Sequence, residues 1–546
     1  MITESSMGTD KDDLRTNRWT ELALRTAGWV LAAAALVPMI FLPLTRDQGH
    51  YAYGGQVILD GGQLYRDVFD GKGPGVYYAY AFALWLFGQT ELGVRLFFYL
   101  LALLGSRLAA AVGRRVGGNW CSLPCALAYA FAAMQGHTDC AWFTAEGEDL
   151  ILPLVLTPVV LLGRREHLAS AWRMALAGFL LALALLVKVT AVTTIAALGL
   201  VTIFCLAVQK RGASAVVKPL LWAMAGMLVP IAAFFMYYGS LGLLGEIHIL
   251  LVRYNREYGS ICLMRDFTDY FRPLTSDRWR ALSVLGIAAV AMVKDKDTTA
   301  WRLFGAVVLG GWLAAGWQGK DFPYQWTPVI GSLAVAAGIT CGRVAQWAWA
   351  NLTNRVWAAA GVATTTLLLP LFAGPTEVYH LNRLYRQTLG LFRGTWTREE
   401  FREHHLTGAA TANVTDKVAA YLREHSQAGD TVQVWGYETI LNFLSNRRSP
   451  TRFVLRFPLS QPGKFRQMWR EQFLREIRSH QPLYVVVLRD DVRTYWLLDE
   501  VSSDGRLKEF AAFDEYLREH YVQETQIDRF LLLRRTPPTP PGPAAH

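Results

Sequence analysis

The sequence has few charged residues for its length. Only 18% of its 546 residues are Asp, Glu, Lys or Arg, whereas 52% are hydrophobic; a typical soluble domain is about 25% charged. The shortage is local, because charged residues make up 14% of positions 1–374 and 26% of positions 375–546. This division excludes an ordinary soluble enzyme, a disordered chain and a nucleic-acid binder with one basic patch. It predicts an α-helical polytopic membrane protein with a C-terminal soluble α/β domain.

Cysteine is scarce and is absent from the C-terminal part. All six cysteines fall within residues 1–374, which excludes a secreted disulfide scaffold. Cys140 and Cys262 fall in loops between apolar stretches, and a bridge between them is an open alternative that nothing else in the sequence supports. Cys121 and Cys125 lie one helical turn apart. Because no second pair of metal ligands accompanies them, we interpret them as small core residues and predict no metal site.

Long apolar stretches fill the first part of the chain. A helix needs about 20 apolar residues to cross a bilayer, and the first candidate is 27–44, for which a signal peptide is the alternative. That alternative is weaker, because no small-residue cleavage site follows and the pattern recurs ten more times. The other stretches are 92–112, 119–137, 149–163, 170–187, 189–209, 219–238, 280–293, 301–317, 323–342 and 356–374. Residues 187–190 are either a hinge between two spans or a bend in one.

Basic residues predict the direction of these eleven spans. They cluster in alternate connections: Arg107/Arg114/Arg115, Arg164/Arg165/Arg173, Lys210/Arg211/Lys218, Lys294/Lys296/Arg302 and Arg343/Arg355. Short basic loops stay in the cytoplasm. We therefore expect residues 1–26 inside the cell, and the loops 45–91 and 239–279 outside with the chain after Gly374. Val76–Phe87 is apolar but too short to span, and we interpret it as an interfacial helix at the outer face.

The C-terminal part reads as a connector and a small domain. After a connector, 375–412, the pattern over 413–535 predicts alternating helices and strands, and residues 536–546 form a Pro-rich disordered tail. Strands are expected at 430–435, 483–488, 522–525 and 530–533, and helices at 416–425, 437–444, 465–480 and 512–520. Since this domain has no Gly-rich phosphate loop and no triad motif, we expect it to bind or shape access of an acceptor, with no catalysis of its own.

The glycine-rich loop 45–75 carries an unusual set of polar residues between two apolar segments. Asp47 is followed by His50 and Tyr51, and Lys72 stands just before the interfacial helix. A solvated loop is the simpler interpretation of any one of these residues. Together they indicate a site.

Several motifs, in order along the chain, resemble those of GT-C glycosyltransferases. They are Asp47 with Tyr51, Lys72-Gly-Pro-Gly-Val-Tyr-Tyr78, Leu86-Phe-Gly with Glu91-Leu and Arg95, Glu148-Asp-Leu, Leu186-Val-Lys188 and Lys320-Asp-Phe-Pro-Tyr324. The resemblance covers about residues 20–375. It is to the dolichyl-phosphate-mannose and aminoarabinose transferase type, which is similar to glycosyltransferase family 39. The chain departs from the pattern at Gln48, where the family often has a second acid, and at Gly73, where it has proline.

The resemblance implies an inverting transfer of a sugar from a polyprenyl phosphate to an acceptor hydroxyl. Such a hydroxyl needs a base within hydrogen-bond reach, and cations must balance the charge that develops on the leaving phosphate. Ionisable residues at a membrane edge are functional by default. The expected roles are Asp47 as base and Glu148 as supporting acid; Lys72, Arg253, Arg256, Lys188 and Lys320 as donor-phosphate ligands; and Tyr51, His50, Tyr77 and Tyr78 as acceptor or sugar ligands.

No cofactor is expected. His137 with Asp139 and Glu146 is a conceivable site for a divalent cation, but their spacing is nonspecific. The expected partners are a polyprenyl-phosphate sugar, a lipid or glycan acceptor in preference to a protein, and membrane lipids, with no nucleic acid. The expected location is the inner (plasma) membrane. A transporter or flippase for lipid-linked sugars is the alternative, although no internal repeat supports it; a non-catalytic scaffold is a third.

Overall fold

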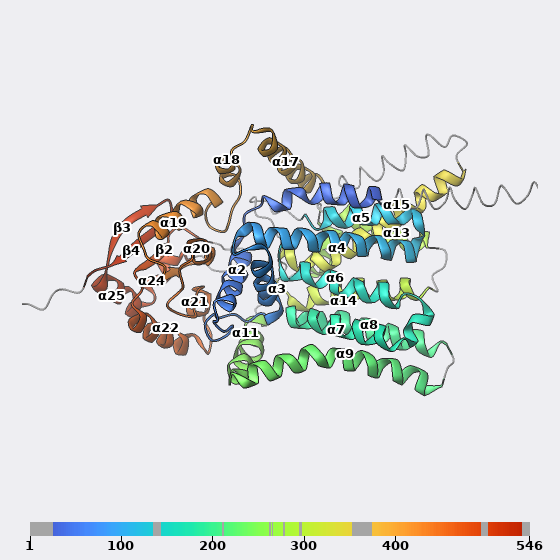
Figure 1. The fold of residues 1–546 in the computed structure, drawn as a ribbon, viewed down its shortest axis with the longest axis horizontal. Coiled ribbons are helices and arrows are strands. Elements are labelled where there is room, and N and C mark those ends of the chain that lie inside the picture. Colours follow the sequence, from blue (N-terminus) through green and yellow to red (C-terminus); the bar gives the residue numbers. More distant parts are fainter. Residues whose placement is uncertain are drawn as a thin grey trace, which may run out of the picture.

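A bundle of long apolar helices is followed by a smaller domain built on a four-stranded sheet (Figure 1). The computed structural model describes residues 26–134, 144–209, 212–260, 264, 266–276, 279–293, 298–320, 322–351, 374–492 and 501–537. This architecture confirms the predicted fold class, a helical membrane protein with a C-terminal α/β domain.

The helices of the bundle coincide with the apolar stretches of the sequence. They are Thr26–Ile40, α4 (Glu91–Gly117), α5 (Ser122–Ala132), α6 (Gly147–Leu162), α7 (Ala171–Val187), α8 (Val192–Ala207), α9 (Ala213–Ser240), α13 (Arg280–Met292), α14 (Thr299–Gln318) and α15 (Thr327–Asn351). Four of these segments, taken with their adjoining 3₁₀ turns, are long and apolar enough to cross a membrane by themselves. Residues 356–373 of the expected last stretch lie outside the described residues, so the number of spans stays a prediction.

Lys188 separates two helices. The helix α7 ends at Val187, Lys188 is extended with φ −154° and ψ 129°, and a 3₁₀ turn over Val189–Ala191 leads into α8. The segment 187–190 is therefore a hinge between two helices, and the alternative of one bent helix is wrong.

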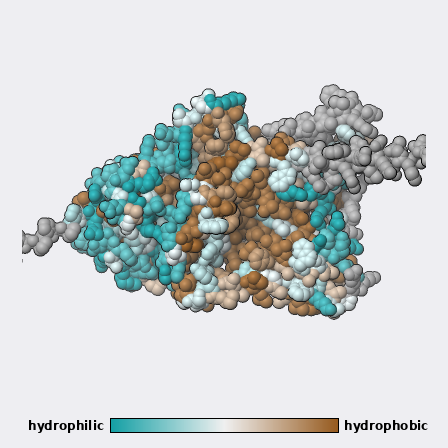
Figure 2. Space-filling model, viewed as in Figure 1, coloured by the Kyte–Doolittle hydropathy of each residue, from teal (hydrophilic) through white to brown (hydrophobic). Residues whose placement is uncertain are grey.

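The surface of the bundle is apolar around its middle. In Figure 2 a brown belt covers the helices, between the hydrophilic C-terminal domain on the left and polar residues at the right-hand end. Predicted inner-loop arginines gather at one end: Arg115 interacts electrostatically with Arg164 and Arg173, and Arg343 reaches the last turn of α4. Several of the loops that carry the basic residues therefore lie at the same end of the bundle, as loops on a common membrane face must.

Two glycines allow α7 and α9 to pack backbone to backbone. A Cβ at Gly178 would lie 1.9 Å from the carbonyl oxygen of Ala223, and a Cβ at Gly226 would lie 1.8 Å from that of Ala175. Membrane helices associate through such small-residue contacts because lipid supplies no hydrophobic drive. Only 11% of the most apolar part of the long helix α9 is buried. The contact with α7 is therefore important for packing α9 against the rest of the bundle.

We expect Gly226→Leu to destabilise the protein by about 1–3 kcal/mol or more, because the new side chain must displace a backbone carbonyl. The measurement is thermal unfolding of the purified protein in detergent. Gly199→Leu on α8 is the matched control, since no atom lies within 4 Å of a Cβ at that position. Equal melting temperatures of the two variants would contradict the packing argument.

Two shorter helices cross the end of the bundle. Figure 1 shows α2 (Arg46–Leu59) and α3 (Pro74–Phe87) lying between the bundle and the C-terminal domain. The helix α3 packs on α2 and α4 and exposes the large side chains of Phe82 and Trp85. This placement agrees with the interpretation of Val76–Phe87 as an interfacial helix and not a span.

The loop 239–279 is also largely helical. It contains α10 (Leu244–Ile247), a π-helical turn (His248–Tyr254), α11 (Asn255–Gly259), a 3₁₀ turn (Phe267–Phe271) and α12 (Arg272–Thr275).

The C-terminal sheet has the strand order β1-β2-β4-β3. The strands β1 (Val432–Trp435) and β2 (Tyr484–Leu488) are parallel, whereas β4 (Phe530–Arg535) is antiparallel to both β2 and β3 (Tyr521–Ile527). Every residue of β1 and β2 is buried, as the apolar run 483–488 predicted for β2. The helices are α17 (Gly374–Arg393), α18 (Arg398–Glu403), α19 (Ala412–Glu424), α20 (Ile440–Ser445), α21 (Phe457–Ser460), α22 (Arg466–His480), α24 (Ser503–Lys508) and α25 (Ala511–His520).

The C-terminal domain rests directly on α2. A Cβ at Gly49 would lie 2.5 Å from Cβ of Ile440, so α2 and α20 touch at a position that admits only glycine. The domain is therefore seated on the helix that carries Asp47.

Candidate active site

Asp47 lies in the first turn of α2, where the helix starts from Thr45. The side chain of Gln48 accepts a hydrogen bond from the Thr45 backbone N–H at 3.2 Å, which closes a capping box. A carboxylate in this turn is favoured by the free N–H groups of the helix. The local sequence therefore begins the helix at a place that presents Asp47 at the end of the bundle.

Lys72 forms an ion pair with Asp47. Its Nζ lies 3.0 Å from Oδ2 of Asp47, and both side chains are 31% exposed. The same ammonium group donates to the Tyr51 hydroxyl and lies 4.5 Å from the centre of the Tyr51 ring. Three of the residues singled out in the loop 45–75 thus meet at one point that a substrate can reach.

The loop around Lys72 is held against the end of α7. A Cβ at Gly73 would lie 2.2 Å from the Leu186 carbonyl oxygen, which explains why this chain has glycine there. The Lys72 carbonyl accepts a hydrogen bond from the Tyr65 hydroxyl at 2.9 Å. Tyr65 itself has φ 72°, a strained conformation for a bulky residue that the surrounding fold must maintain.

Asp70 organises the same loop. Its Oδ1 accepts the Lys72 backbone N–H at 3.1 Å, and its Oδ2 accepts the Tyr77 hydroxyl and lies 3.3 Å from Nε2 of His50. In this structure Tyr77 and His50, expected as sugar ligands, contact the carboxylate that shapes the Lys72 loop.

Two further lysines lie close to this pair. Lys188, at the hinge after α7, forms an ion pair with Glu148 in the first turn of α6, and its Nζ is 5.4 Å from the centre of the Tyr324 ring. Tyr324 in turn interacts electrostatically with Asp47, Lys72 and Glu148. The motifs from four distant parts of the chain therefore converge on one site.

Lys320 joins the site through Tyr258 of α11. Its Nζ donates to the Tyr258 carbonyl at 2.8 Å and lies 4.2 Å from the centre of the Tyr258 ring. Tyr258 interacts electrostatically with Lys72, Asp47 and Asp70.

The Asp47–Lys72 pair is charged at neutral pH. Burial alone would raise the pKa of the Asp47 carboxyl, but Lys72 and Arg46 together lower it below its ordinary value of 3.8. Burial opposes the charge on Lys72, yet Asp47 and Asp70 raise its pKa well above 10.5. Lys72 is therefore a cation, and Asp47 beside it is an ionised carboxylate that can act as a base.

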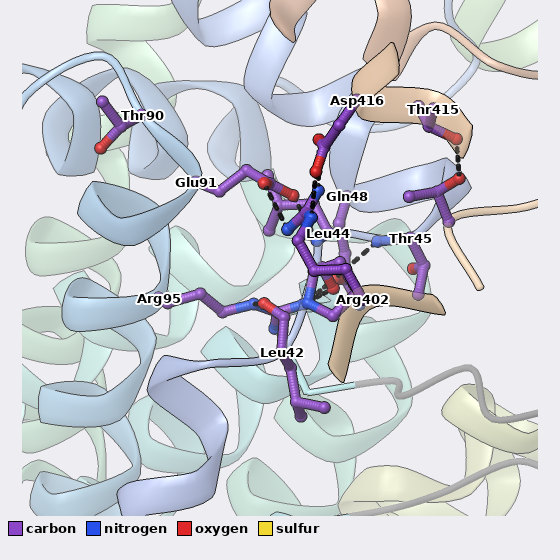
Figure 3. Close-up of polar contacts among 12 residues, drawn as sticks. Leu42, Leu44, Thr45, Gln48, Thr90, Glu91, Arg95, Arg402, Thr415 and Asp416 are labelled. Atoms are coloured by element: carbon purple, nitrogen blue, oxygen red, sulfur yellow. Dashed lines mark hydrogen bonds and ion pairs between the residues drawn. The ribbon is translucent and has the colours of Figure 1, made fainter. Parts of the chain in front are cut away.

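A buried hydrogen-bond network holds Gln48, the residue after Asp47 (Figure 3). Arg95 donates to Gln48 at 2.8 Å, to the Leu42 carbonyl at 2.8 Å, and to Thr144 at 2.9 Å. Gln48 stands where the family named above often has an acid, and it is fully buried. Its side chain accepts the hydrogen bond from Arg95 and donates another to Glu146.

The network extends into the C-terminal domain. Glu91 accepts the Leu44 backbone N–H at 2.9 Å and pairs with Arg402 at 2.9 Å, and Arg402 also pairs with Asp416 (Figure 3). These partly or fully buried ions join the helical bundle to the C-terminal part of the chain.

Three expected ligands lie elsewhere. Arg253 is exposed and lies over the Phe465 ring, 5.2 Å from its centre, and Arg256 is exposed on α11. Among the contacts of the described residues, none joins either arginine to Asp47 or Lys72. Tyr78 is exposed on α3, and its hydroxyl lies 3.4 Å from that of Tyr238.

Within the described ranges, no three His, Cys, Asp or Glu side chains come together as ligands for a metal ion. His137 and Asp139 lie outside those ranges, and so do Cys140 and Cys262. Cys121 and Cys125 are buried free thiols packed among helices, as expected of small core residues.

Sequence reasoning named three of the lysines with Asp47, Tyr51 and Glu148, but it assigned no role to two other residues of the site. Asp70 and Tyr258 belong to the site, and Tyr324 was noted only as part of a motif. The one local signal for Asp70 was its position two residues before Lys72 in a glycine-rich loop. Nothing local could identify Tyr258, because its contact with Lys320 joins residues 62 positions apart.

The fold and the site define an integral membrane protein with ion-paired acids and lysines at one end of its helical bundle. Its structure is similar to that of ArnT from Cupriavidus metallidurans bound to undecaprenyl phosphate, with a TM-score of 0.59 and 16% identity over 94% of this chain and 97% of that one. The apo form of the same protein gives a TM-score of 0.57 at 16% identity, over 95% of this chain and 98% of that one.

A second similar structure is that of the archaeal oligosaccharyltransferase AglB from Archaeoglobus fulgidus, in complex with an inhibitory peptide and a dolichol-phosphate. Its TM-score is 0.51 at 11% identity, over 96% of this chain and 75% of that one. No protein-family model and no curated protein matches the sequence. The chain shares the fold of these two proteins over most of its length.

Proposed function

We propose that this protein is an inverting glycosyltransferase that moves a sugar from a polyprenyl-phosphate donor to an acceptor hydroxyl. The observation that carries the proposal is the accessible Asp47–Lys72 ion pair, with Lys188 and Lys320 beside it. The fold supports it, because the two proteins with similar structures bind undecaprenyl phosphate and dolichol-phosphate.

In this mechanism the lysines bind the donor phosphate and Asp47 acts on the acceptor. When the phosphate takes Lys72 as its partner, Asp47 loses the charge that lowers its pKa and becomes a stronger base. The acceptor oxygen then attacks the anomeric carbon, Asp47 accepts the hydroxyl proton, and the bond from that carbon to phosphate oxygen breaks. The electron pair leaves with the phosphate, where Lys72 balances the charge.

Glu148 has a different task from Asp47 in this proposal. Its carboxylate is almost fully buried against Lys188, so it holds that lysine near the phosphate and does not itself reach the acceptor. Tyr51 orients the Lys72 ammonium. The exposed Arg253 and Arg256 are left out of the donor site.

We further propose that the membrane is the inner (plasma) membrane and that the N-terminus is cytoplasmic. The site and the C-terminal domain then face the extracytoplasmic side. The gathered arginines at the opposite end of the bundle support this direction.

The direct test is to incubate the purified protein with a panel of polyprenyl-phosphate sugars and to identify products by mass spectrometry. We expect release of polyprenyl phosphate from at least one donor, and much faster release when the matching acceptor is present. Absence of release from every donor would refute the proposed function.

The depressed pKa of Asp47 predicts a pH profile. Since the base form exists above that pKa, kcat/KM is expected to be flat from about pH 5 to 8 and to fall only below the ordinary carboxyl range. Arg46→Gln removes a positive charge that lowers this pKa, so its acid limb should move to higher pH. Arg518→Gln, at an exposed position, is the control; an unmoved acid limb in Arg46→Gln would contradict the assignment.

A further inference from the structure

A second concave site lies beside the Asp47–Lys72 pair. It is a pocket of about 200 Å³ between α11 and the segment that joins α21 to α22. Its lining residues come from the loop 239–279 and from the C-terminal domain: Tyr254, Glu257, Tyr258, Ser260, Gln461 and Arg466, with Phe465, Trp469 and the Pro458–Gly463 segment. The mechanism above uses none of these side chains to bind the donor.

One wall of the pocket is aromatic and rigid. Trp469 is 2% exposed, stacks on Phe465 with ring centres 5.2 Å apart, and meets the Tyr254 ring edge to face at 5.1 Å. Because Trp469 is almost fully buried, the partly exposed rings of Tyr254, Tyr258 and Phe465 in front of it are the ones that can meet a ligand with a flat, weakly apolar side. The C–H face of a sugar ring is of this kind.

The rim of the pocket is polar. Oε1 of Glu257 accepts the Lys464 backbone N–H at 2.9 Å, which holds the carboxylate at the rim. Gly463 makes room for it, because a Cβ there would lie 2.6 Å from the same oxygen. Gln461 and Arg466 supply an amide and a guanidinium. A carboxylate, an amide and a guanidinium together can bond several neighbouring hydroxyls.

This lining favours a sugar over the other acceptor classes. An acyl chain needs an apolar groove without charged groups at its rim, and a peptide that binds by strand addition needs an unpaired strand edge. The lining residues belong to helices and a connecting segment, and none belongs to the four strands that the structure describes.

The pocket borders the reacting groups. Asn255, the first residue of α11 and the neighbour of the pocket residue Tyr254, donates a hydrogen bond to the carbonyl of Gly71, the residue before Lys72. Tyr258 lines the pocket and also carries Lys320 on its ring and carbonyl. A sugar bound in the pocket can therefore extend a hydroxyl, or a linked second sugar, toward Asp47.

We propose that this pocket binds the acceptor of the transfer, and that the acceptor is a saccharide. The proposal rests on the proposed function in calling the bound molecule the acceptor, whereas the binding of a saccharide can be tested without turnover. The transferred sugar would form a glycosidic bond to a hydroxyl of the bound saccharide, whose proton goes to Asp47 as the phosphate leaves.

The test uses the full-length purified protein, fluorescently labelled and applied to an array of defined oligosaccharides. We compare it with Gln461→Ala/Arg466→Ala and with Gln467→Ala/Arg478→Ala, a matched control of the same residue types, both exposed on α22. We expect the native protein to bind a subset of the glycans, the pocket variant to bind them at least tenfold more weakly, and the control to bind them normally. A glycan that binds is then supplied as acceptor, and the pocket variant should raise its KM at least tenfold.

The outcomes separate the two proposals. Donor release without glycan binding, equal weakening in pocket and control variants, or binding of serine or threonine peptides in place of glycans would overturn the saccharide site. Glycan binding that depends on Gln461 and Arg466, with no release from any donor, would support the pocket and refute the proposed function.

Discussion

Asp47→Asn is expected to lower the rate of sugar transfer by about 10³-fold, within the range that a positioned general base contributes. The amide cannot accept the proton of the acceptor hydroxyl, although it keeps the shape of the carboxylate. Because Lys72 loses an anionic partner, the variant should still bind undecaprenyl phosphate, at least as tightly as the native protein. The measurements are product formation by mass spectrometry and binding of undecaprenyl phosphate by calorimetry.

Asp60→Asn is the matched control for this prediction. Asp60 is the residue that ends the same helix α2, it is exposed, and its nearest cation is Arg448 at 3.5 Å. Its activity should be close to native. Near-native turnover by Asp47→Asn would exclude Asp47 as the base of the transfer.

Lys72→Met is expected to lower kcat/KM by about 10²-fold or more and to weaken undecaprenyl phosphate binding about tenfold. The side chain keeps its length but loses the charge that would balance the leaving phosphate. It also leaves the Asp47 carboxylate half-buried without its cation, so the acid limb of any residual activity should move to higher pH.

Lys72→Arg should recover part of this loss, since it restores the charge without the compact geometry of an ammonium group. Lys508→Met, at an exposed position on α24, should be without effect and is the control for the loss of a lysine. If Lys72→Met turned over donor like the control, the phosphate role of Lys72 would be wrong, whatever the role of Asp47.

Much of the fold was predictable because it follows from local patterns. Apolar stretches of sufficient length located the helices of the bundle. Short runs such as 483–488 located strands of the small sheet, since a strand buried on both faces of a parallel pair reads as a near-continuous apolar run. The sequence, in contrast, did not decide whether Lys188 lies in a bend within one helix or in a hinge between two, because its ion-pair partner, Glu148, belongs to another helix.

The site was predictable only in part. Asp47, Tyr51 and Lys72 belong to one loop with matching motifs, and they do lie together. Arg253 and Arg256 looked equivalent to Lys320 in the sequence, since all three are basic and at the outer face. The fold distinguishes them: Arg253 stacks on Phe465 of the C-terminal domain, whereas Lys320 turns toward Tyr258. Such a choice depends on how distant segments pack and leaves no trace in local spacing.

The contact between Gly49 and Ile440 limits how the protein can be divided or recombined. The C-terminal domain sits on the helix that carries Asp47, and it is tied to the start of α4 through Arg402 and Glu91. A truncated chain without that domain would leave both surfaces exposed and Glu91 without its cation. A chimaera intended to exchange acceptor preference would therefore have to take the C-terminal domain together with α2 and the beginning of α4 from the same parent.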